Sequence, residues 1–101
     1  MILQNDQYYF SGQVPVLDVC QKYNCPLYVY DSAIMKRQYD RMKNAFDIPS
    51  LRINYACKAL TNVSILRFFQ SLGAGLDTVS VQEVELGLHA GFDPQNFIFT
   101  P

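Results

Sequence analysis

The sequence predicts an α/β domain built on a parallel sheet. Three short β-prone segments, residues 51–57, 76–79 and 96–99, recur at a period of roughly 20 to 25 residues, as expected of strand-plus-helix units. The two intervals between them show the apolar spacing of amphipathic helices, over residues 63–72 and 81–90. Strands that alternate with helices in this way pair in parallel.

The two intervening helices have clear start and stop signals. Asn62 is placed to cap the first helix, which Gly73 ends. Ser80 is placed to cap the second, which Gly91 ends. These signals fix the order strand, helix, strand, helix, strand.

The first half of the chain also alternates between strand and helix patterns. A strand, a helix, a strand and a helix are expected over residues 8–10, 14–23, 27–30 and 33–46. Asn24 is a plausible stop for the first of these helices, and Asp31 or Ser32 can cap the second. Tyr28 and Tyr30 are expected to pack against a neighbouring sheet.

The length of 101 residues adds a constraint. Three strands cannot close a barrel, and an open parallel sheet has bare edges. We therefore expect the chain to be the N-terminal part of a longer protein, because a complete eight-stranded α/β barrel takes about 250 residues.

Composition excludes several classes of protein. Half of the residues are hydrophobic and 17% are charged, which is unlike a disordered chain. The net charge of −1 provides no basic field for a nucleic acid or an anionic membrane. No apolar run reaches the length of about 18 residues that a spanning helix needs, and no signal peptide is visible. A cytoplasmic globular protein is expected.

The cysteines do not indicate a disulfide framework or a metal site. There are three of them, an odd number. Cys20 and Cys25 would need two further soft ligands to hold zinc, and His89 is the only histidine. No metal is expected, and burial of these cysteines as small apolar groups is the better interpretation.

Lys58 is the first candidate for chemistry. It ends the segment Ile-Asn-Tyr-Ala-Cys-Lys, where alternation places it on the same strand face as Asn54 and Ala56. The carboxyl ends of barrel strands are where active sites form, and an amine partly removed from water there becomes a better nucleophile. Ala56 leaves room beside it. The alternative is a lysine that extends to solvent at the barrel rim.

Asp77 and Glu83 are the acidic candidates. A carboxylate inside the apolar run around Asp77 is costly to bury without a partner. Lys58 on the neighbouring strand could be that partner, or Asp77 could face outward or accept backbone hydrogen bonds. Ser80 and Glu83 form the Ser-x-x-Glu pattern of a capping box, a structural role that does not exclude a place in a site.

An ordered series of motifs resembles a known family. Its main parts are Tyr-Ala-Cys-Lys-Ala at 55–59, Gly-Ala-Gly-Leu-Asp-Thr-Val-Ser at 73–80 and Ala-Gly-Phe at 90–92. Pro-Leu-Tyr-Val-Tyr-Asp at 26–31 precedes them in register. The series resembles the fold-type III pyridoxal-phosphate decarboxylases, and within them the diaminopimelate decarboxylases.

The resemblance implies a domain plan and site roles. Residues 32–101 would be the first part of a pyridoxal-phosphate-binding (β/α)8 TIM barrel, and residues 1–31 would join a β-rich C-terminal domain. Lys58 corresponds to the catalytic lysine that holds pyridoxal 5'-phosphate as a Schiff base. Asp77 and Glu83 correspond to acidic residues that bind the cofactor.

The resemblance also implies a function. It is the decarboxylation of meso-diaminopimelate to L-lysine by a cytoplasmic homodimer, with a small amino acid as partner and no nucleic acid or membrane. Ornithine, arginine or carboxynorspermidine decarboxylase remains an alternative, as does a non-catalytic cofactor-binding protein or an interaction module without cofactor. The 101-residue chain alone is expected to be inactive.

Overall fold

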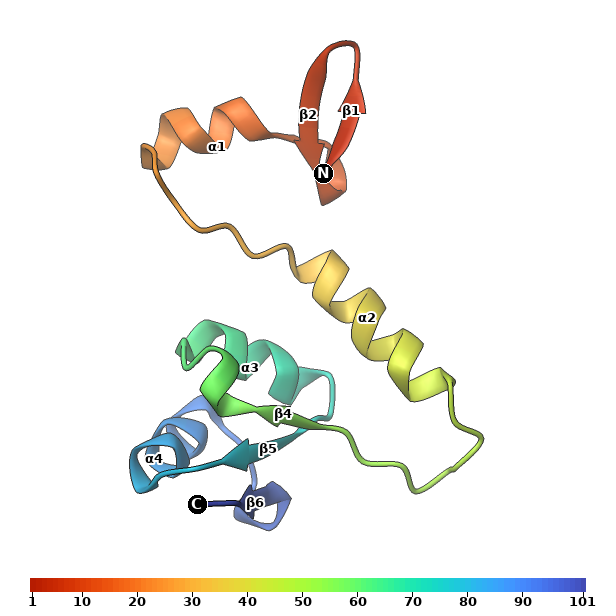
Figure 1. Ribbon diagram of the computed structural model, residues 1–101, viewed down its shortest axis with the longest axis vertical. Coiled ribbons are helices and arrows are strands. Elements are labelled where there is room, and N and C mark those ends of the chain that lie inside the picture. The colour runs from red at the N-terminus through yellow and green to blue at the C-terminus, as the bar shows by residue number, and fades with distance from the viewer. The chain divides into compact units, whose positions relative to one another are not determined.

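The computed structural model describes residues 1–101 and divides into two compact units, Met1–Met42 and Lys43–Pro101 (Figure 1). The first unit opens with a small antiparallel sheet in the order β1-β2-β3. Its strands are β1 (Ile2–Gln4), β2 (Gln7–Phe10) and β3 (Val14–Pro15). The expected strand at residues 8–10 is confirmed as part of β2.

The two strands that pair with β2 were not predicted from the sequence. Asn5 and Asp6 join β1 to β2 with φ angles of 48° and 60°, the positive values of a tight two-residue hairpin turn. A 3-10 turn, η1 (Ser11–Gln13), then leads into β3. Strands of two and three residues are too short to show an alternating pattern.

The two helices of the first part of the chain form where expected. Helix α1 (Val16–Tyr23) ends at Asn24, whose φ of 64° turns the chain away. Helix α2 (Ser32–Asn44) is capped by Asp31, because its Oδ1 accepts the backbone N–H groups of Ala33 and Ile34 at 3.0 and 3.3 Å.

The strand expected at residues 27–30 does not form. The segment is irregular, and Tyr28 is 92% exposed while Tyr30 is also exposed. The packing predicted for these tyrosines is therefore wrong for this chain. A β-prone run becomes a strand only when another strand accepts and donates its backbone hydrogen bonds, and this segment pairs with none.

The second unit contains the predicted parallel sheet, in the order β4-β5-β6 (Figure 1). Its strands are β4 (Asn54–Ala56), β5 (Gly75–Thr78) and β6 (Phe97–Phe99). Between them lie the 3-10 turns η2 (Cys57–Ala59) and η3 (Pro94–Asn96) and the helices α3 (Val63–Ser71) and α4 (Val81–Ala90). The predicted caps are confirmed: the Asn62 side chain accepts the N–H groups of Ser64 and Ile65, and Gly91 ends α4 with a φ of 98°.

The hydrophobic core lies on one face of this sheet. Tyr55, Leu76 and Phe97 are in register across the three strands and pack with α3 and α4 around a buried cluster of Cys57, Leu66, Leu76, Ala90 and Phe92. Complete burial of a leucine such as Leu66 contributes about 1.5 to 3 kcal/mol. Because strand side chains alternate, the register pairs Asn54–Gly75 and Ala56–Asp77 lie on the opposite face.

None of the helices is long and apolar enough to cross a bilayer.

Candidate functional site

Lys58 lies just beyond the end of β4. The last register pair of β4 with β5 is Ala56 with Asp77, after which the backbone enters η2. The N–H of Leu60 donates to the carbonyl of Cys57 at 3.1 Å and closes the turn. Lys58 is therefore exposed on a turn rather than part of the strand, so the strand alternation from which its face was predicted does not extend to it.

Asp77 lies on the sheet face opposite α3 and α4. Its carboxylate is hydrogen-bonded to Thr100, the residue that follows β6. Its Oδ1 accepts a hydrogen bond from the Thr100 hydroxyl at 2.7 Å. Lys58 forms no ion pair with it, since the one ion pair in the structure joins Lys36 to Asp40. Of the alternatives left open by the sequence, the Lys58 partnership is not observed, and the actual partner is a side-chain hydroxyl.

Ser80 and Glu83 form one of the two hydrogen bonds of the predicted capping box. The Glu83 N–H donates to the Ser80 Oγ at 3.3 Å, and the Glu83 Oε2 accepts the Val79 N–H at 2.8 Å. The carboxylate thus reaches one residue further back than the usual cap N–H. Glu83 is only 8% exposed, so it fastens the start of α4 to the carboxyl end of β5.

Cys57 connects Glu83 with the turn that carries Lys58. The Cys57 side chain is completely buried. Burial raises the pKa of the Cys57 thiol, and the negative charge of Glu83 raises it further. The turn that carries Lys58 also contacts β5, so it lies close to the β5–α4 junction at the carboxyl end of the sheet.

The other cysteines depart from the prediction of burial. Cys20 is half-buried and Cys25 is exposed, because Cys25 lies in the irregular segment after α1. A hydrogen bond with Cys20 raises the pKa of the Cys25 thiol. The structure gathers no group of three or more histidine, cysteine or acidic side chains that could hold a metal ion.

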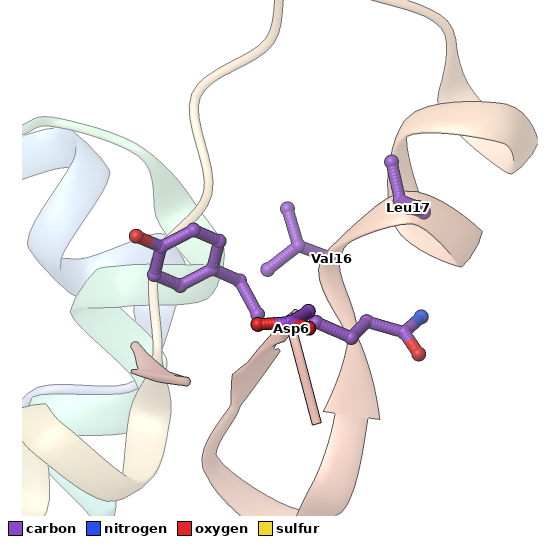
Figure 2. A pocket seen from close by; sticks show the side chains of 5 residues that line it. Asp6, Val16 and Leu17 are labelled. Carbon is purple, nitrogen blue, oxygen red and sulfur yellow. The ribbon is translucent and has the colours of Figure 1, made fainter. Parts of the chain in front are cut away.

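Two surface hollows of the first unit contain none of the predicted site residues. One, of about 240 Å³, lies between the β1–β2 turn and the start of α1, where Figure 2 shows Asp6, Val16 and Leu17 around it. Another, of about 230 Å³, is lined by residues between Phe10 and Ser32. The chemistry-bearing groups belong instead to the ends of the parallel strands.

Thr100 is a residue of the candidate site that was not predicted from the sequence. Its backbone N–H donates to the Thr78 carbonyl at 2.9 Å, which extends the β5–β6 pairing and brings its hydroxyl to Asp77. The available signal was its position directly after the third strand, because the ends of parallel strands meet at one edge of a sheet.

A parallel sheet with an exposed amine and a carboxylate at its carboxyl edge is the arrangement on which enzymes of the α/β-barrel class build their active sites. The family model for the pyridoxal-dependent decarboxylases, pyridoxal binding domain, matches residues 32–101. The chain belongs to this family.

Named relatives agree with the family match. The chain is 41% identical to the diaminopimelate decarboxylase of Vibrio cholerae over 98 residues, which cover 96% of the chain and 23% of that protein. It is 35% identical to that of Methanothermobacter thermautotrophicus over 91 residues, 88% of the chain and 21% of the relative. The chain thus spans less than a quarter of the length of these relatives.

Solved structures confirm the fold. The diaminopimelate decarboxylase from M. jannaschi superposes with a TM-score of 0.89 at 26% identity, over 98% of this chain and 24% of the other. The Helicobacter pylori enzyme, complexed with L-lysine, gives a TM-score of 0.75 at 35% identity, over 82% and 21% of the two chains. The predicted α/β class, with the first strands of a pyridoxal-phosphate-binding barrel, is confirmed by these likenesses and by the parallel sheet.

Proposed function

We propose that this chain is the cofactor-anchoring part of a pyridoxal-phosphate-dependent decarboxylase that converts meso-diaminopimelate to L-lysine. The family match and the relatives named diaminopimelate decarboxylase support this activity. The observation in the structure that carries the proposal is the exposed Lys58 amine on the turn after β4, with Asp77 across from Ala56 on the neighbouring strand.

The residues present fit the cofactor. Pyridoxal phosphate carries an aldehyde, which reacts with a primary amine, and Lys58 offers one that is exposed and engaged in no ion pair. Ala56 is in register with Asp77 and has only a methyl group, so the sheet face beside the carboxylate leaves space for a flat ring. Lys58 would hold the cofactor covalently, Asp77 would lie beside it, and Glu83 would shape the adjoining strand end.

The chemistry divides between the cofactor and the chain. When bound, the cofactor supplies an electron sink for the carbon that loses its carboxylate. Lys58 binds the cofactor and, once its amine is free, is placed to hold and return a proton. Asp77 contributes a fixed negative charge, which Thr100 orients. Glu83 keeps the β5–α4 junction in place through Val79.

We extend the proposal to the rest of the molecule. Residues 32–101 would belong to the barrel and residues 1–31 to a second, β-rich domain. The antiparallel sheet β1-β2-β3 supports this division, as do the exposed apolar side chains Ile2, Leu3 and Tyr8 on it. A cytoplasmic homodimer that acts on a small amino acid completes the proposal.

The test is the site of covalent attachment in the full-length protein. Borohydride reduction of protein loaded with pyridoxal phosphate, followed by peptide mass spectrometry, should place the label on Lys58. Lys58→Ala should abolish the visible absorption band and decarboxylation, whereas Lys43→Ala, the matched change at an exposed lysine of α2, should preserve both.

Product analysis separates the substrates. Release of carbon dioxide should be fastest with meso-diaminopimelate and slow with ornithine or arginine. A label on another residue would refute the role of Lys58, and preferred turnover of ornithine or arginine would refute the substrate.

A further inference from the structure

A hydrogen bond closes a loop around Lys58. The Tyr55 hydroxyl, from β4, donates to the backbone carbonyl of Leu60 at 3.2 Å. Tyr55 and Leu60 lie on either side of η2, so this bond joins the strand before the lysine turn to the segment after it. The turn is therefore held at both ends by one side chain.

The ring of Tyr55 is itself fixed from α3. It stacks on Phe69 with ring centroids 4.2 Å apart and an angle of 14° between the planes. Tyr55 also packs against the buried core cluster. A stacked, half-buried ring has little rotational freedom, so its hydroxyl presents a fixed donor.

Leu60 uses both of its backbone polar groups in this arrangement. Its carbonyl accepts from Tyr55 and its N–H donates to the carbonyl of Cys57. Cys57 is anchored in turn by a completely buried side chain. The residue between these anchors, Lys58, is exposed. Its backbone is thus fixed while its amine remains accessible.

We propose that Tyr55 is a positioning residue for the Lys58 amine. The inference rests on the proposed function, in which Lys58 holds the cofactor. A lysine side chain has many rotamers, so fixing its backbone limits the positions that the amine can reach, and a shift of about 1 Å at a reacting group is enough to slow chemistry strongly. Tyr55 makes the turn rigid before the cofactor arrives.

The test uses Tyr55→Phe in the full-length protein, because this change removes the hydroxyl and keeps the stacked ring. Tyr28→Phe is the matched control, since Tyr28 is 92% exposed. In protein freed of cofactor, amide hydrogen exchange at Leu60 should be about fivefold faster in Tyr55→Phe, as expected for the loss of one hydrogen bond.

Cofactor binding gives the second measurement. The dissociation constant of pyridoxal phosphate, from titration of the visible band, should rise about fivefold in Tyr55→Phe, with kcat reduced and KM nearly unchanged. Phe69→Leu, which keeps the hydroxyl and removes the stacking ring, should change exchange and affinity in the same direction. Tyr28→Phe should change neither.

The outcomes separate this inference from the proposed function. Unchanged exchange at Leu60 in both variants would overturn the positioning role, and so would weaker cofactor binding without faster exchange, which would indicate direct contact between the hydroxyl and the cofactor. Failure of Lys58 to take the borohydride label in the unaltered protein would refute the proposed function. Amide hydrogen exchange at Leu60 would still show whether Tyr55 makes the turn rigid.

Discussion

Thr100 donates its hydroxyl to Asp77 at 2.7 Å, across 23 positions of sequence. The contact exists because β5 and β6 pair in parallel, with Thr78 in register with Phe99. Thr100 continues that pairing through its backbone N–H. One oxygen of the Asp77 carboxylate is thus hydrogen-bonded to the residue after the neighbouring strand, and this bond restricts rotation of the Asp77 side chain.

We expect Thr100→Val to loosen Asp77 without disturbing the strand, because valine keeps the branched shape and the backbone N–H. The dissociation constant of pyridoxal phosphate in the full-length protein should rise roughly two- to fivefold, the effect of one exposed hydrogen bond. Thr100→Ser retains the hydroxyl and should bind as the unaltered protein does. Equal affinities in all three proteins would show that the bond does not orient Asp77.

Gly87 allows α4 to approach the sheet closely. A Cβ at this position would lie 2.4 Å from the Leu76 Cδ2 and 2.6 Å from the Phe97 Cε1. Alanine in a helix is favoured over glycine by about 1 kcal/mol, but overpacking a core costs about 1 to 3 kcal/mol. We expect Gly87→Ala to lower the free energy of unfolding by about 1 kcal/mol, as measured by urea denaturation.

The double variant Gly87→Ala/Leu76→Val tests the cause. Because valine has no Cδ atoms, it removes the closest contact, and the double variant should be more stable than the sum of the two single changes predicts. Strict additivity would mean that the contact with Leu76 is not the source of the loss.

Asp31 should make stability depend on pH below neutrality. Hydrogen bonds from Ser11 hold the pKa of the Asp31 carboxyl below its ordinary value of 3.8, with smaller contributions from the backbone N–H groups of Ile34 and Ala33. A carboxyl whose pKa is lower in the folded state adds stability above the unfolded value, and that stability is lost as the pH falls through the folded value.

The comparison is with Asp31→Asn, which cannot titrate. The unaltered protein should have the larger free energy of unfolding, and the difference from Asp31→Asn should be constant above about pH 5. The difference should shrink as the pH drops below 3.8 and disappear in stronger acid. Thermal unfolding at a series of pH values measures it. An advantage that grew on acidification would show that the carboxylate is not stabilised by these bonds.

Local signals predicted the elements that have their own caps. Asn62, Ser80 and Gly91 fix helix ends through bonds or backbone angles that involve only nearby residues, and the structure has them as expected. The strand predictions that failed are those that depend on pairing between residues far apart in the sequence. Residues 27–30 have β propensity but no partner strand in this structure, and β1 and β3 exist because β2 pairs with them.

The candidate site shows the same division. The capping box of Ser80 and Glu83 is a short-range pattern and could be predicted. The place of Lys58 depends on where β4 stops pairing with β5, which a continuous apolar run does not reveal. The partner of Asp77 comes from a strand whose register cannot be derived from sequence alone.

Neither α3 nor α4 covers the face of the parallel sheet that bears Ala56 and Asp77, since both pack on the other side. Parallel sheets are stable when both faces are shielded. In an α/β barrel this face turns inward, where side chains of the other strands fill the interior, while the groups of the active site gather at the carboxyl ends of the strands. Under the proposed function, residues at the ends of the other strands can therefore change which amino acid is accepted without altering the turn that carries Lys58, because each strand end contributes its own side chains to the site.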